Sequence, residues 1–63
     1  MRTVLHLVRP GATPQFVAAR DWVVYLQVME LAPSAHPAPF PPGLVTHDQL
    51  LHLGFSADLV LTW

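Results

Sequence analysis

The sequence predicts one small α/β domain over residues 1–63, a two-layer or three-layer unit with a mostly parallel sheet. Two observations lead to this fold class. A chain of 63 residues suffices for a single domain, and aliphatic, β-branched runs alternate with helix signals. The expected order is β-α-β, a proline-rich connector over residues 32–43, then α-β. Alternation of strands with helices favours parallel pairing through crossover connections.

The first strand is expected at residues 3–8, whose nearly continuous apolarity is typical of a strand buried on both faces. Pro10 and Gly11 end it, because these residues interrupt regular structure. Thr13 followed by proline matches a helix N-cap and first helical position, so a short helix is predicted over residues 15–20.

The strongest strand signal is the aromatic and β-branched run from Trp22 to Val28. The connector that follows at residues 32–43 contains five prolines, a density that excludes helix and central strand. We interpret it as a stiff connector; the alternative is a proline-rich ligand for a recognition domain.

The last third of the chain carries the clearest local motif. The run Thr46–Gln49 fits a capping box, in which the threonine and glutamine side chains bond each other's backbone amides. A helix is therefore expected to about Leu53, with Gly54 as a left-handed stop. A very short strand is expected at Leu44–Val45, and a final strand at residues 59–63.

Composition points to association with protein. The chain is 52% hydrophobic and 11% charged, whereas ordinary domains carry about 25% charged residues, so an exposed apolar patch is expected. It has no cysteine, which excludes disulfides and thiolate metal sites, and small folds without them commonly rely on oligomerisation. The net charge of −1 argues against direct nucleic-acid binding. No apolar run is long enough for a membrane span, so a cytoplasmic location is expected.

Three aromatic residues are the candidates for partner contact: Trp22, Tyr25 and Trp63. Aromatic side chains are enriched at interface hot spots, but they are equally common in cores and at sheet edges. Both interpretations stay open from the sequence. The partner is expected to be a second copy of the chain or a sister subunit.

A weak small-ligand site is the second candidate, made of His6, Arg9 and Gly11. Here a histidine in the first strand would meet a turn whose backbone amides face an anion at a helix start. A packed, hydrogen-bonded His6 is the plainer interpretation. The turn lacks a glycine-rich phosphate fingerprint.

Enzymatic chemistry is not expected. Ser34 and Ser56 lie outside any nucleophile-elbow motif. Asp48 and His52 share a helix face, with His47 about 100° away, and two ligands do not make a zinc site. We therefore predict no catalytic residue, no metal and no cofactor.

Four segments resemble the TusB/DsrH family of sulfur-relay proteins: Leu5–Pro10, Val23–Gln27, Val45–Leu51 and Leu59–Trp63. The first matches the family's Leu-His pair before an arginine-containing turn, and the last its closing strand ending in tryptophan. The similarity covers about 28 residues at the start and about 20 at the end, in short motifs. Family members are longer, with a middle α/β segment where this chain has prolines and with Asp-Gly where it has Val28 and Met29.

The resemblance implies a small α/β fold that works inside hetero-oligomers, which relay sulfur for tRNA 2-thiouridine formation or sulfur oxidation. In such assemblies the persulfide is carried on cysteine. This chain has none, so the resemblance implies a non-catalytic interaction or structural subunit. The alternatives are a stand-alone homo-oligomer and a small-ligand binder that uses the His6 turn.

Overall fold

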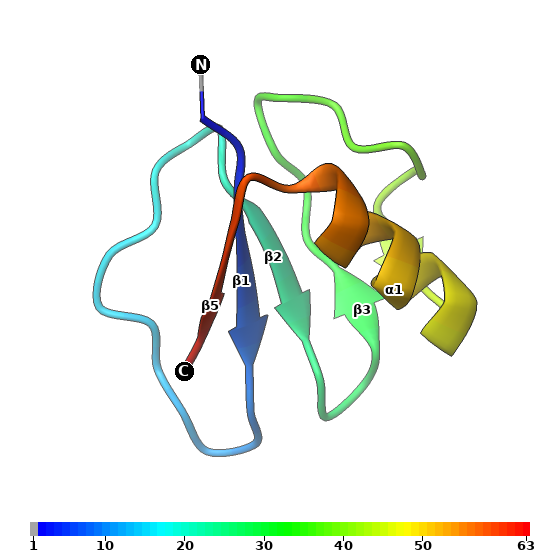
Figure 1. Cartoon of the computed structure of the whole chain (residues 1–63). Coiled ribbons are helices and arrows are strands. Elements are labelled where there is room, and N and C mark those ends of the chain that lie inside the picture. The colour runs from blue at the N-terminus through cyan, green and yellow to red at the C-terminus, as the bar shows by residue number, and fades with distance from the viewer. Residues whose placement is uncertain (1) are drawn as a thin grey trace.

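Five strands form one sheet in the order β4-β3-β2-β1-β5, and one helix lies on one face of it (Figure 1). The computed structural model describes residues 2–63. The elements are β1 Val4–Val8, β2 Trp22–Tyr25, β3 Glu30–Leu31, β4 Gly43–Leu44, α1 His47–Ser56 and β5 Leu59–Thr62. β1 pairs in parallel with β2 and β5, whereas β3 pairs antiparallel with β2 and β4. The α/β class is confirmed, but the sheet is mixed and the predicted β-α-β start is wrong.

The helix predicted over residues 15–20 does not form; residues 9–21 are an irregular loop instead. Pro10 and Gly11 occupy the centre of a turn closed by the Ala12 amide and the Arg9 carbonyl (3.0 Å), with Gly11 at φ 79°. Proline followed by a positive-φ glycine is the signature of a type II turn. A helix of two turns forms only where tertiary packing stabilises it. In Figure 1 this loop extends outward beyond β5 and away from the helix α1.

β2 is shorter than the predicted run from Trp22 to Val28. The chain turns at residues 26–29 and returns as β3, with Tyr25 opposite Glu30. Met29 makes the turn possible by adopting φ 51°, and its carbonyl accepts the amide of Val45 (2.9 Å). A hairpin therefore replaces the extension of the strand.

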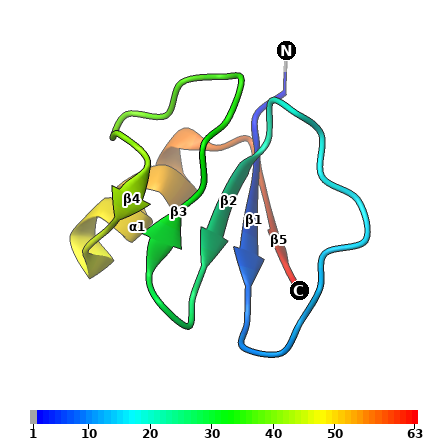
Figure 2. The ribbon, with the colours of Figure 1, turned by 180° about the vertical axis from the view of Figure 1, so that it is seen from behind.

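Residues 32–42 contain neither helix nor strand, as their prolines predict. β4 then begins at Gly43, one residue before the predicted strand at Leu44–Val45. Ala38 and Phe40 of the connector pack against the hydrophobic core. Figure 2 shows this connector running from β3 past one end of the sheet to β4.

The capping box of α1 is confirmed. The Gln49 amide donates to the Thr46 hydroxyl (3.2 Å), and the Thr46 amide donates to the Gln49 side chain (2.9 Å). The predicted stop at Gly54 is wrong, because the helix continues to Ser56 and ends where the Ala57 amide bonds the Leu53 carbonyl (3.0 Å). The next residue, Asp58, donates its amide to the Thr3 carbonyl (2.8 Å), and β5 begins one residue later beside β1.

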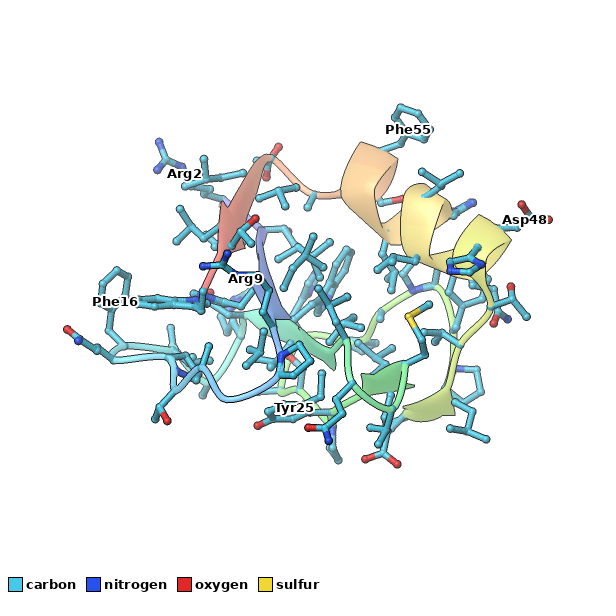
Figure 3. All side chains as sticks on the ribbon, turned by 90° about the horizontal axis from the view of Figure 1, so that it is seen from below. Arg2, Arg9, Phe16, Tyr25, Asp48 and Phe55 are labelled. Atoms are coloured by element: carbon cyan, nitrogen blue, oxygen red, sulfur yellow. The ribbon has the colours of Figure 1, made fainter. Side chains whose placement is uncertain are left out.

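The core lies between α1 and the sheet. Its buried side chains are Leu5, Trp22, Val24, Leu31, Val45 and Leu53. Side chains alternate across a strand, so Leu5 and Leu7 of β1 face the helix while His6 faces the loop of residues 9–21. Figure 3 shows the helix and this loop on opposite sides of the sheet. The molecule therefore has one helical layer, and the loop covers the other face.

Candidate functional site

His6 is the one fully buried polar residue in the described part of the chain, with an exposed fraction of 0%. It lies in the middle of β1, between the parallel neighbours Val23 of β2 and Leu61 of β5. A buried imidazole without partners is costly, so its hydrogen bonds decide what it can do.

Both ring nitrogens of His6 are engaged. The indole N–H of Trp63 donates to Nδ1 (2.8 Å), and Nε2 lies 2.7 Å from Oδ2 of Asp21. Because an indole nitrogen can only donate, Nδ1 must accept, so the proton is on Nε2 and is donated to Asp21. Trp63, His6 and Asp21 thus form one directed hydrogen-bond chain that links β5, β1 and the end of the loop.

Asp21 also receives the backbone amide of Ala18 (3.0 Å). Burial opposes its ionised form, but the hydrogen bonds from His6 and Ala18 outweigh that effect. The pKa of Asp21 consequently lies below its ordinary value of 3.8. The Trp63 contact fixes the tautomer that places an N–H on Nε2, and this N–H helps to hold the carboxylate charged.

Aromatic packing closes this cluster. The ring of Phe16 meets Trp63 edge-on at 5.0 Å between centroids and meets His6 at 6.4 Å. Arg9 donates from Nε to the Trp63 carbonyl (2.7 Å), which ties the end of the strand to the turn. The cluster is a structural tie, and His6 has no nitrogen left for an external substrate.

The three residues of the predicted small-ligand site lie in different surroundings. His6 is fully buried and is not among the residues that line the two hollows described below. Arg9 is exposed and points its Nε at the chain's own carbonyl, and Gly11 lies in a turn that no helix follows. The three residues lie near one another along the chain, but His6 is fully buried whereas Arg9 and Gly11 are exposed.

The three partner candidates do not form one surface. Trp22 is 3% exposed; its indole donates to the His36 carbonyl (3.0 Å) and its ring stacks on that histidine, so it belongs to the core. Its burial leaves Trp22 little surface for the predicted partner contact. Tyr25 is 42% exposed, and Trp63 is half-buried against His6 on the opposite face from Trp22.

A feature that the single residues did not reveal is an apolar groove of about 270 Å³ beside α1. Its lining consists of Leu5, Leu7, Leu50, Leu51, Gly54, Phe55 and Val60, all apolar. Phe55 is 88% exposed at its rim and points away from the sheet in Figure 3. Composition predicted an apolar patch, but its place depends on Gly54 being helical and on β5 lying beside β1.

A second hollow of about 310 Å³ follows the proline-rich connector. Its lining is Leu31, Ala32, Ser34 and residues 37–42, which include no titratable side chain. The hydroxyl of Ser34 donates to the Ala19 carbonyl (3.3 Å). This hollow offers no group for acid–base or nucleophilic chemistry.

The histidines of α1 do not assemble a metal site. His47 and Asp48 are exposed, and His52 packs edge-on against Phe40 at 5.2 Å between centroids. Within residues 2–63, no three His, Cys, Asp or Glu side chains lie close enough together to hold an ion.

Comparison with known proteins found no match among family models, curated proteins or solved structures. The resemblance to the TusB/DsrH family therefore stays a prediction from the residues. Over the described residues, no helix has the length and apolarity that crossing a bilayer requires.

Proposed function

We propose that this chain is a non-catalytic interaction subunit that binds a protein partner through the apolar groove beside α1. The groove carries the proposal, because its seven lining residues are all apolar and three of them are well exposed. Leu51, Phe55 and Val60 gather there from the helix and the edge strand. Contiguous apolar surface of this kind is typical of an interaction site.

The partner is expected to present an apolar helix face or aliphatic side chains. Removing apolar surface from water contributes about 25 cal/mol per Å², so covering one exposed phenylalanine stabilises a complex by roughly 1.5–3 kcal/mol. Phe55 is the side chain from which the largest contribution is expected, because it is the most exposed of the three. Charged partners would gain little, since the groove provides no group to pair with them.

The resemblance of the terminal segments makes a sulfur-relay subunit the proposed partner class. The partner would supply the persulfide-bearing cysteine that this chain does not have. The chain would then position or stabilise the sulfur-carrying subunit. The buried, fully bonded His6 is compatible with such a role, since it offers no free acid or base.

The test is purification of the tagged full chain from its native cells, with identification of the proteins that accompany it in stoichiometric amounts. The proposal expects a cysteine-carrying sulfurtransferase or sister subunit, and expects Phe55→Glu to abolish its recovery. Leu44→Glu is the matched control, because Leu44 is also well exposed, at 79% against 88% for Phe55, and lies on the far edge of the sheet. Equal losses with both variants, or co-purification only of proteins without such a cysteine, contradict the proposal.

A further inference from the structure

We infer that two copies of this chain associate through the outer edges of β5, which pair antiparallel into one continuous sheet. Within residues 2–63, no strand covers that edge. The inference goes beyond the proposed function, because it concerns the backbone edge of β5 and needs no sulfur-relay partner, although Val60 and Phe55 line both this edge and the groove.

The backbone of β5 presents unused hydrogen-bonding groups at this edge. The amides of Leu59 and Trp63 donate inward, to carbonyls in and beside β1 (3.2 and 2.9 Å). Successive backbone groups of a strand point to opposite edges, so the N–H and C=O groups of Val60 and Thr62 point outward. Two such edges related by a two-fold axis can satisfy each other, because Val60 of one copy faces Thr62 of the other.

The two edges of the sheet differ in how they are protected. β4 is two residues long and follows Pro41 and Pro42, features that prevent pairing with another chain. β5 is four residues long and contains no proline, glycine or charge. An unprotected apolar edge of this kind is a template for strand addition.

Charge favours the antiparallel direction. Asp58 lies at the start of β5, where its carboxylate accepts the Thr3 amide (2.7 Å). Arg9 lies at the other end, held by the Trp63 carbonyl (2.7 Å). Antiparallel pairing brings Asp58 of each copy to the end that carries Arg9 of the other. The two-fold axis repeats this opposite-charge contact, whereas parallel pairing would place like charges together.

Exposed apolar side chains flank the edge on both faces of the sheet. Leu59 and Phe16 lie on the face of the loop, and Val60 and Phe55 on the face of the helix. Covering these four residues in both copies would remove on the order of 1000 Å² of accessible surface, which is the lower limit for a specific interface. The dimer would therefore cover part of the groove, because Val60 and Phe55 also line it.

The mass of the purified full chain, measured by light scattering and sedimentation from micromolar to millimolar concentration, is the first test. We expect a dimer that Thr62→Pro converts to monomer. Proline removes the Thr62 amide in each of the two copies, so the dimer loses two hydrogen bonds and its dissociation constant should rise roughly tenfold or more. Thr62→Ala is the matched control: it keeps the amide and should leave the dimer intact. A monomer at every concentration overturns the inference.

Amide hydrogen exchange on the unmodified chain tests the same edge without relying on a proline variant. We expect the Val60 and Thr62 amides to exchange at least about tenfold more slowly in the dimer than in the monomer. A dimer in which both amides exchange as fast as in the monomer does not pair through the β5 backbone, and it overturns the inference.

The direction of pairing has its own variant. Arg9→Glu should weaken the dimer at low salt, whereas Arg20→Glu, the same charge change in the loop, should weaken it less. Equal effects of the two variants contradict the antiparallel arrangement. None of these measurements uses a sulfur-relay partner, so failure of the dimer and failure of the proposed function are separate results.

Discussion

Trp63 and His6, 57 positions apart in the chain, are joined by a hydrogen bond of 2.8 Å from the indole N–H to Nδ1. The contact fixes the histidine tautomer and attaches the end of β5 to the centre of the sheet. On its other side His6 holds Asp21, which closes the loop of residues 9–21 over this face.

Replacement of Trp63 by phenylalanine removes the donor and leaves Nδ1 of His6 buried without a partner. We expect a loss of about 1–3 kcal/mol in the free energy of unfolding, measured by urea denaturation. Tyr25→Phe is the control, because that hydroxyl belongs to an exposed side chain. In a double-mutant cycle with His6→Leu the two losses should not add; strict additivity would show that the bond contributes nothing.

Acid should destabilise the protein through Asp21. Its pKa is lower in the folded state than the ordinary value of 3.8, so its contribution is present above that value and is lost as the pH falls through the folded pKa. In Asp21→Asn the free energy of unfolding should therefore fall less steeply as the pH is lowered. The exposed Asp48→Asn is the control, and an unchanged pH dependence in Asp21→Asn would contradict the assignment.

The two glycines Gly11 and Gly54 should respond in opposite directions to alanine. Gly11→Ala places a side chain at φ 79°, a strained conformation even though nothing lies within 4 Å of the new Cβ, and should cost about 1 kcal/mol. Gly54→Ala lies inside α1 in open space and should stabilise by roughly 0.5–1 kcal/mol. Thermal denaturation measures both, and the same sign for the two would refute the turn or the helix assignment.

Thr46 should matter where the similar Thr13 does not. Thr46→Ala removes the hydroxyl that accepts the Gln49 amide and should lower the free energy of unfolding by about 1 kcal/mol. Denaturation and helical circular dichroism measure this loss. Thr13→Ala is the control, because no helix follows it. A comparable loss at Thr13 would mean that the loop of residues 9–21 contains a cap.

Local signals alone account for several elements of this fold. The Thr46–Gln49 capping box bonds within one turn, and proline removes the donors that helices and central strands need, so both features are readable from neighbouring residues. The β1 segment and the last strand follow from their aliphatic runs. The general excess of apolar over charged residues likewise predicted an exposed apolar patch.

Only the tertiary structure decided the rest, because the deciding contacts join distant parts of the chain. The segment at residues 15–20 has the residues of a short helix, but it forms part of a loop that covers His6. The hydrogen bond between His6 and Asp21 attaches this loop to the sheet. The sequence was compatible with either a surface or a core position for Trp22. Packing of the connector and α1 against the sheet places it in the core. The groove beside Phe55 and the open edge of β5 exist only because β5 pairs with β1, and both proposals rest on that non-local pairing.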